Sequence, residues 1–427
     1  MTMASAAPVV APRSGAGAGT VAIVAPGGSS SHAESFTQRG WRSVTVELDT
    51  RCRTSALAPV QGAGGRAESV EHRGSLRQTV KALRGLGVSA VVAGSAAGVG
   101  LAERIAWHLG LPLGDPETSA LRHDRGAQAA ALARAGVPAP RGIRSASLAE
   151  VLAWAETCRL PGYLLAPAAA GVPVEPVPCD GKQQISTFWP AMKRAAALHS
   201  DDACLVLTER LPDRQFVVNS VSRPGTDGRA EHAITDVWAE TRSRDRSLDR
   251  VDLLFPDEPL TRVLSAYVLR VLDVLGVMRG PVTARVAYAE DRGPLLVSAL
   301  AVPGVSPADE ALRRATGYDR LTDALDTPVL PLSVPFVPGP AGQRVVRVCV
   351  RRDDGAAVDP RLGRFLRRLP TAVVVSADLL GHAPVRPAAR GAEVVLSSDE
   401  PDAVEADYHV IRAVEGYLRP LSMTPRM

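Results

Sequence analysis

The sequence predicts a mixed α/β (α+β) protein that begins with a small parallel sheet and continues into antiparallel strands. Short apolar runs at residues 21–25, 44–48 and 90–94 alternate with stretches of helical spacing at residues 76–86 and 99–109. Strands that alternate with helices in this way are typical of a parallel sheet with helices on its faces. Later strand-like runs are separated by short turns, which favours antiparallel pairing.

The composition is that of an ordinary globular protein. The chain has 427 residues, 46% of them hydrophobic and 22% charged, which is enough for roughly two to four compact units. Only three of the 49 basic residues are lysine, and the arginines are spread along the whole chain. Nucleic-acid binding needs basic residues gathered on one face, often with aromatic platforms, yet only 4% of the residues are aromatic. We therefore expect no nucleic-acid partner.

Cysteine usage and the N-terminus indicate a cytoplasmic protein. The five cysteines are widely spaced, odd in number and without a Cys-x-x-Cys pair, which favours reduced thiols. Residues 1–18 are rich in Ala, Gly, Ser and Pro and lack the features of a signal peptide, so we expect a disordered tail. No apolar run approaches the roughly 20 residues that a membrane helix needs, so we expect no membrane partner.

The elements after the parallel sheet follow from capping and turn signals. Thr118 and Ser119 are candidate caps of a helix through residues 128–135, and Ser147 begins another helix. Strands are predicted at residues 203–209, 215–221, 283–289 and 295–300, with a helix at residues 260–275. Glu-Asp-Arg-Gly at residues 290–293 predicts a hairpin turn. Further strands are expected at residues 345–350, 372–376 and 393–396, and an amphipathic helix after Pro401.

Six short sequence segments follow one another along the chain in a characteristic order. They are Val-Ala-Gly-Ser at 92–95, Pro-Glu-Thr-Ser at 116–119, Leu-Arg-His-Asp-Arg at 121–125, Ala-Gly-Val-Pro at 135–138, Tyr-Leu-Leu-Ala-Pro at 163–167 and Thr-Asp-Val-Trp at 235–238. In this order they resemble the ATP-grasp superfamily, particularly actinobacterial carboxylate-amine ligase-like proteins. The resemblance implies a preATP-grasp domain at residues 19–115, a two-lobed ATP-grasp core at 116–305 and a C-terminal lobe at 306–427.

The resemblance also implies which residues lie at the nucleotide site. Arg125 is at the position of the family's first phosphate-binding lysine, and Ala166 is at the position of the second. Glu209, followed by Arg210, is similar to a hinge glutamate near the adenine and ribose, and Gln215 replaces a nearby acidic contact. A carboxylate solvated at a strand end is an equal alternative for Glu209. Residues 168–176 correspond to the glycine-rich flap but keep one glycine and gain prolines, which cannot donate amide hydrogens. These positions imply a degenerate nucleotide cleft.

The implied metal positions lack carboxylates. The family holds magnesium with acidic residues and an asparagine on two strands, whereas this chain has Arg285, Ser298 and Leu300 there. Hard cations need several charged or carbonyl oxygens, so we expect no metal site. Because two buried guanidinium groups without an anion are costly, we expect a carboxylate, from a ligand or from Glu209, close to Arg125 or Arg285.

Other candidate residues are less specific. His123 and His232 are expected nearest the cleft and are candidate acid-base groups, although lone histidines are more often structural. The mixed-charge run at residues 242–250 is interpreted as a solvated loop, with an anion grip at the cleft mouth as the alternative.

Three functional hypotheses remain open from the sequence. The first is a pseudoenzyme, for which we expect no cofactor. It would bind an anionic metabolite or an active ligase partner in specialised metabolism. The second is an active ATP- and magnesium-dependent carboxylate-amine ligase with an arginine-based site, since arginine binds phosphate bidentately. The third is an ATP-independent enzyme repurposed from the ligase fold. The sequence also leaves a homodimer open.

Overall fold

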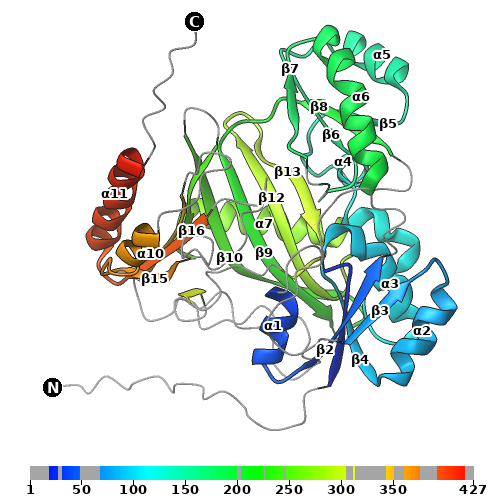
Figure 1. Ribbon diagram of the computed structural model, residues 1–427. Helices are drawn as coiled ribbons and strands as arrows, with labels where there is room; N and C mark the ends of the chain where they lie inside the picture. The colour runs from blue at the N-terminus through cyan, green and yellow to red at the C-terminus, as the bar shows by residue number, and fades with distance from the viewer. Residues whose placement is uncertain are drawn as a thin grey trace, which may run out of the picture.

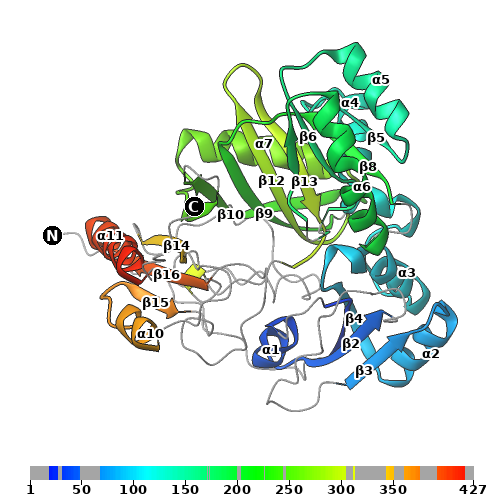
Figure 2. The ribbon, with the colours of Figure 1, turned by 45° about the horizontal axis from the view of Figure 1, so that its top comes forward.

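The computed structural model describes residues 19–26, 31–48, 68–170, 172, 174–199, 203–225, 227–243, 247–303, 311–312, 343–350, 360–375 and 392–418. The predicted tail at residues 1–18 lies outside this part of the chain. Figures 1 and 2 show the described elements arranged around one large sheet, with two smaller sheets next to it.

The first sheet is parallel, with strand order β3-β2-β1-β4. Its strands are β1 (Thr20–Val24), β2 (Arg42–Leu48), β3 (Glu68–His72) and β4 (Val88–Ala93), and its helices are α1 (Ser31–Gln38), α2 (Leu76–Gly85) and α3 (Val99–Leu109). Every residue of β1 is buried, which explains its continuous apolar run. The predicted parallel sheet is confirmed. Strand β3 was not predicted because it is a largely exposed edge strand with two glutamates.

The second sheet is antiparallel, with strand order β5-β8-β6-β7. It consists of β5 (Gly142–Ser145), β6 (Tyr163–Pro167), β7 (Val177–Cys179) and β8 (Leu205–Glu209), packed against α5 (Leu148–Cys158) and α6 (Lys182–His199). We call this unit the small lobe. Helix α6 was not predicted, because Pro190 in its interior and the Pro/Gly-rich stretch before it are signals against a helix.

Helix α4 (Arg125–Arg134) begins where Asp124 caps it, with Oδ1 accepting from the Ala127 N–H at 2.8 Å. Thr118 and Ser119 were expected as its caps, and this is wrong. Both lie inside a separate 3-10 helix, η3 (Pro116–Arg122), which starts with a proline and is capped by Asp115.

The large sheet has eight strands in the order β13-β12-β9-β10-β11-β14-β16-β15, and neighbouring strands are antiparallel. Its first half comprises β9 (Gln215–Pro224), β10 (Ala230–Arg242), β11 (Leu248–Leu253), β12 (Gly280–Ala289) and β13 (Gly293–Leu300). Helix α7 (Pro259–Val274) covers one face of these strands through Leu264, Val268 and Val271, which are fully buried. The predicted helix and hairpin are therefore confirmed.

The C-terminal strands extend this same sheet. They are β14 (Arg344–Val350), β15 (Ala372–Val375) and β16 (Ala392–Ser398), accompanied by α10 (Pro360–Leu366) and α11 (Pro401–Leu418). Val404 and Ile411 of α11 are buried against β14 and β16, which confirms the amphipathic helix after Pro401. In the part of the chain that is described, no helix is both long enough and apolar enough to cross a membrane.

A buried ion pair joins α3 to η3. Arg122 donates from Nε and Nη2 to the two carboxylate oxygens of Glu103, and both side chains are 2% exposed. Gly114 packs against the pair, since a Cβ at this position would lie 2.2 Å from Glu103 Oε1. The pair fixes the connection between the parallel sheet and the elements that follow it.

We expect Glu103→Gln to lower the free energy of unfolding by about 3–5 kcal/mol, because it leaves a buried guanidinium without its counter-charge. Urea unfolding followed by circular dichroism measures this. The control is Glu68→Gln, which removes an exposed pair with Arg42, with side chains 46% and 54% exposed. The free energy of unfolding of Glu68→Gln should fall by less than about 1 kcal/mol. Equal decreases in the two variants would contradict the role of the buried pair.

Candidate functional site

Arg285 lies in the middle of β12 and points away from α7. Its neighbours Ala284 and Val286 are fully buried in the core that α7 covers. Because successive side chains of a strand point to opposite faces, Arg285 lies on the other face of the large sheet. We call this face the Arg285 face. Ser298 of β13 is directly opposite Arg285, so these two implied metal positions are adjacent.

Glu240 of β10 holds Arg285. Arg285 Nη2 donates to Glu240 Oε1 at 2.6 Å, and Arg242 Nη2 donates to Glu240 Oε2 at 3.1 Å. The Glu240 side chain is 3% exposed, whereas that of Arg285 is 42% exposed. One buried carboxylate is therefore shared by two guanidinium groups, and Arg285 remains accessible to solvent. A carboxylate was expected beside Arg125 or Arg285, and Glu240 rather than Glu209 supplies it.

Arg125 begins α4 and binds the backbone that follows β6. Its Nη1 donates to the carbonyl oxygens of Pro167 at 2.9 Å and Ala169 at 3.4 Å. The pKa of Arg125 is lowered to about 10, first by burial and then by the positive charge of Arg285. The two arginines therefore belong to one electrostatic site. We call Arg125, Arg242, Arg285 and Glu240 the arginine site.

Ala166 places no charge at the second lysine position. Tyr163 and Leu165 pack against α5 and α6, so Ala166 faces the other side of the small sheet, where it is 3% exposed. The start of the segment that resembles the flap is also buried, and its Ala170 N–H donates to the His123 carbonyl at 2.7 Å. This segment packs on the residues that lead into α4.

Glu209 is a buried ion-pair residue at the end of β8. Its Oε1 accepts from Arg292 Nη1 at 2.8 Å and from the Arg141 N–H at 2.9 Å, and its Oε2 accepts from Arg141 Nη2 at 3.1 Å. Burial raises the pKa of Glu209, but the hydrogen bonds from Arg292 and Arg141 outweigh it and hold the pKa below its ordinary value. The alternative of a solvated strand-end carboxylate is therefore wrong. Because Arg292 belongs to the β12–β13 hairpin, the pair ties the small lobe to the large sheet.

The other implied nucleotide residues lie near this junction. Arg210 donates from Nη2 to Asp180 Oδ1 at 2.8 Å, within the small lobe. Gln215 begins β9 and is partly exposed. Next to Arg285 along β12, an apolar cluster lies on the Arg285 face. It consists of Leu211, Ala287, Ala289 and Leu295.

The two candidate histidines lie on different faces. His123 is half-buried and precedes Arg125 by two residues, at the end of η3. His232 lies on the opposite face of the large sheet, where Nε2 is 3.3 Å from Asp273 of α7 and Nδ1 is 2.7 Å from the Ser222 hydroxyl. Burial lowers the pKa of His232 despite the nearby Asp273 carboxylate. The expectation that His232 faces the cleft is wrong, because the β10 bulge at residues 234–236 changes which side chains share a face.

No family model matches the chain, and no curated protein matches its sequence. Solved structures do match. The L-amino acid ligase from Bacillus licheniformis has a TM-score of 0.70 at 13% identity, over 92% of this chain and 97% of that chain. The N5-carboxyaminoimidazole ribonucleotide synthetase from Thermus thermophilus has a TM-score of 0.64 at 16% identity, over 95% and 100%. The biotin carboxylase from Campylobacter jejuni has a TM-score of 0.63 at 13% identity, over 92% and 90%.

This chain has the ATP-grasp fold. The predicted fold class is therefore confirmed. At these identities the likeness establishes the arrangement of the chain, and the chemistry must be argued from the side chains.

The residues at the implied metal positions do not fit a magnesium ion. Divalent cations prefer several carboxylate or carbonyl oxygens. Ser298 offers one hydroxyl, Leu300 offers none, and the acid beside Arg285 is already bound by two arginines. Glu290 and Asp291 are exposed at the β12–β13 turn, as predicted. In the described ranges, no three His, Cys, Asp or Glu side chains are grouped to hold a metal.

Sequence reasoning missed Glu240, although a signal for it existed. Asp236, Trp238 and Glu240 recur with period two along β10, and all three are buried on the Arg285 face. A buried polar residue on a strand face requires a partner, which points to the neighbouring strands. Arg141 and Arg292, the partners of Glu209, carry no such signal, because each belongs to a loop outside the regular elements.

We expect Glu209→Gln to lower the free energy of unfolding at neutral pH by about 1–3 kcal/mol, since the neutral amide weakens the charge-assisted hydrogen bonds from Arg141 and Arg292. The folded-state pKa of Glu209 is depressed, so its contribution is complete above the ordinary carboxyl pKa and is lost as the pH falls through the folded pKa. The difference between wild type and variant should therefore shrink below about pH 4.

Urea unfolding at neutral and acidic pH measures this difference. Glu231→Gln is the control, because its pair with Arg223 is half-exposed on the Glu231 side. A Glu209→Gln difference that stays constant from neutral to acidic pH would show that the carboxylate charge contributes nothing.

Proposed function

We propose that this protein is a pseudoenzyme on the ATP-grasp fold that binds an anionic small molecule at the arginine site without a divalent metal. The observation that carries the proposal is the pairing of Arg285 with Glu240. A cation occupies an implied metal position, and its only buried acid is shared with Arg242. Two guanidinium groups share the single negative charge of Glu240, so a bound anion would supply a second negative charge to them.

The position of Arg125 supports the same proposal. Burial and the charge of Arg285 both lower its pKa, so the folded chain holds this guanidinium at an energetic cost. Its Nε finds no hydrogen-bond partner in the described structure. An anion placed between Arg125 and Arg285 would relieve their mutual repulsion.

Metal-dependent ATP chemistry is less well supported by the side chains. Similar structures are described as complexes with ATP or with the magnesium salt of ADP. Phosphoryl transfer depends on neutralising phosphate charge with lysine and magnesium. In this chain Ala166 contributes no charge, Arg125 is engaged with backbone carbonyls, and Arg285 repels a divalent cation.

An arginine-based ligase is the second candidate. It is favoured by one observation, the electrostatic proximity of Arg125 and Arg285, which would allow both to clamp one phosphate chain. The two functions differ in their response to magnesium.

We expect magnesium not to strengthen the binding of ATP or of citrate, which serves here as a carboxylate probe. Isothermal titration calorimetry with EDTA and with excess magnesium measures this. Arg285→Ala should weaken binding of the anion by about tenfold or more, because a charged hydrogen bond is lost. Arg223→Ala, which removes an exposed pair at the far end of β9, is the control.

Magnesium-dependent ATP binding that Arg285→Ala abolishes would favour the ligase. Failure of both ATP and citrate to bind would contradict the anion site itself.

Glu240→Gln should strengthen binding of the same anion by about tenfold, because it removes the internal carboxylate that competes for Arg285. The amide oxygen still accepts a hydrogen bond, so the fold should persist with a stability loss of about 1–3 kcal/mol. Titration of citrate into wild type and variant provides the comparison. Weaker binding in Glu240→Gln would show that Glu240 orients Arg285 rather than competing with the ligand.

A further inference from the structure

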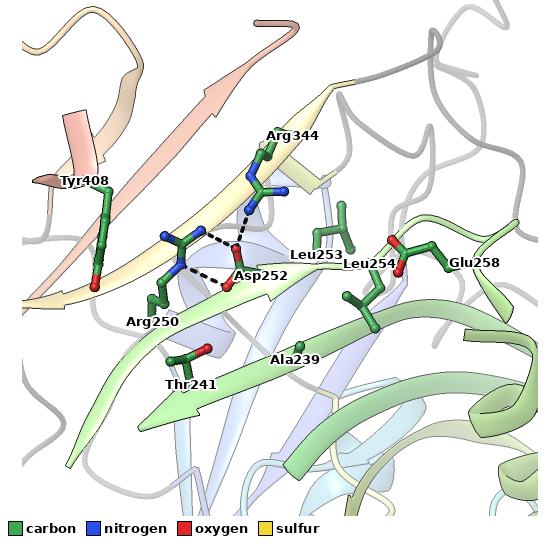
Figure 3. A pocket seen from close by; sticks show the side chains of 9 residues that line it. All are labelled: Ala239, Thr241, Arg250, Asp252, Leu253, Leu254, Glu258, Arg344 and Tyr408. Carbon is green, nitrogen blue, oxygen red and sulfur yellow. Dashed lines mark hydrogen bonds and ion pairs between the residues drawn. The ribbon is translucent and has the colours of Figure 1, made fainter. Parts of the chain in front are cut away.

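A pocket of about 560 Å³ lies on the face of the large sheet that is opposite the arginine site. Ala239 lines this pocket, while the next residue, Glu240, belongs to the arginine site. Successive residues of a strand point to opposite faces, so the sheet separates the two sites. The pocket lies between the beginning of α7 and helix α11, and its volume is within the usual range for small-molecule sites (Figure 3).

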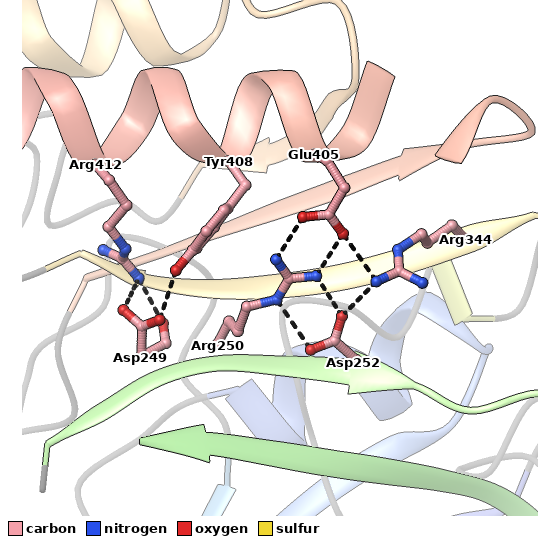
Figure 4. A network of polar contacts seen from close by, with 7 residues as sticks. All are labelled: Asp249, Arg250, Asp252, Arg344, Glu405, Tyr408 and Arg412. Atoms are coloured by element: carbon pink, nitrogen blue, oxygen red, sulfur yellow. Dashed lines mark hydrogen bonds and ion pairs between the residues drawn. The ribbon is translucent and has the colours of Figure 1, made fainter. Parts of the chain in front are cut away.

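One wall of the pocket is fixed by a closed ion-pair network. Arg250 donates to Asp252 from Nε at 3.0 Å and to Glu405 of α11 from Nη1 and Nη2, each at 2.8 Å. Arg344 donates from Nη2 to Asp252 at 3.0 Å and to Glu405 at 2.9 Å. Figure 4 shows that these four residues alternate in charge, so each acid contacts both arginines. Tyr408 packs beside them, with the Arg250 guanidinium 4.5 Å from its ring centroid. The network therefore holds β11, β14 and α11 together along this wall.

Arg344 keeps unused donors in this wall. Both of its ion pairs use Nη2, its side chain is 27% exposed, and within the described residues its Nη1 makes no hydrogen bond. Because Arg344 lines the pocket and a guanidinium group carries five N–H donors, Nη1 can donate to an acceptor from outside the chain. A carboxylate is the acceptor that fits a guanidinium best.

Glu258 provides the opposite charge at the other end of the pocket. It is the N-cap residue of α7, but its side chain makes no capping hydrogen bond to that helix. Its Oε1 accepts from the Phe255 N–H at 2.9 Å, and no basic side chain within the described residues pairs with it. In Figure 3 the Glu258 carboxylate points toward Leu253 and Leu254, which lie between it and Arg344.

We propose that this pocket binds an elongated zwitterion, with its carboxylate on Arg344, its apolar chain over Leu253 and Leu254, and its ammonium group on Glu258. A simple anion would satisfy Arg344 but would lie near the acids Asp252 and Glu258. A simple cation would satisfy Glu258 and leave the Arg344 Nη1 without an acceptor. Only a ligand with both charges, separated by an apolar chain, matches both ends.

The test uses the full-length protein and compounds that differ in end charge. Calorimetry with δ-aminovalerate, valerate and pentylamine compares the zwitterion with each singly charged analogue of the same chain length. γ-Aminobutyrate and ε-aminocaproate vary the separation of the charges. We expect saturable binding of at least one of the three zwitterions and at least about tenfold weaker binding of both singly charged compounds.

Glu258→Gln should weaken binding of the zwitterion by about tenfold, because the carboxylate charge is lost while the acceptor for the Phe255 N–H is kept. Asp257→Asn is the matched control, since it removes the neighbouring exposed charge at the start of α7 and does not line the pocket. Ala239→Leu, which fills the pocket floor without changing charge, should also reduce binding. The same titration in Arg285→Ala shows whether the zwitterion binds at this pocket or at the arginine site, because loss of binding in that variant would place the ligand at Arg285 and contradict the proposal.

Three further outcomes would overturn the proposal. They are the absence of binding for all three zwitterions, valerate or pentylamine binding as tightly as δ-aminovalerate, and equal weakening by Asp257→Asn and Glu258→Gln. Circular dichroism of each variant shows whether the fold is kept.

Discussion

Ion pairs between arginine and buried or partly buried carboxylates connect the parts of this molecule. Arg122 and Glu103 join η3 to α3, Arg292 and Glu209 join the β12–β13 hairpin to the small lobe, and Arg250 and Glu405 join β11 to α11. A buried charge without its partner costs several kcal/mol, so each pair strongly disfavours separation of the elements that it links. Of the 49 basic residues, 46 are arginine, so arginine provides the cation of nearly every such pair.

The same constraint distinguishes structural arginines from those available to a ligand. Arg122 is 2% exposed and fully engaged with Glu103, so it has no capacity for a further partner. Arg285 shares its acid with Arg242 and is 42% exposed, and Arg344 uses one of its nitrogens for both of its pairs. Incomplete pairing at an accessible position is the property that the two proposed sites have in common. They lie on opposite faces of one sheet, so a ligand at one need not contact the other.

The ATP-grasp fold sets the frame of the arginine site without deciding its chemistry. The fold pairs β12 with β13, places the start of α4 against the end of β6, and joins α4 to β13 through two hydrogen bonds between Gln128 and Ala299. Whether this frame transfers phosphate depends on the side chains at a few positions. A guanidinium such as that of Arg285 attracts an anion and repels a metal ion, which is the basis of the function that we propose.

The sequence by itself determined the fold class and most strands of the first and large sheets, and it suggested through a resemblance that Ala166, Arg285 and Ser298 belong to one site. These follow from local apolar periodicity and from residue identity, which need no knowledge of distant contacts. Only the tertiary structure decided which charges meet. Glu240 lies 45 residues before Arg285, and the β10 bulge placed His232 on the opposite face from the one expected. Glu209 was recognised, but its partners Arg141 and Arg292 come from loops 68 and 83 residues away. Such pairs depend on strand register and on packing between sheets, which periodicity along the chain does not encode.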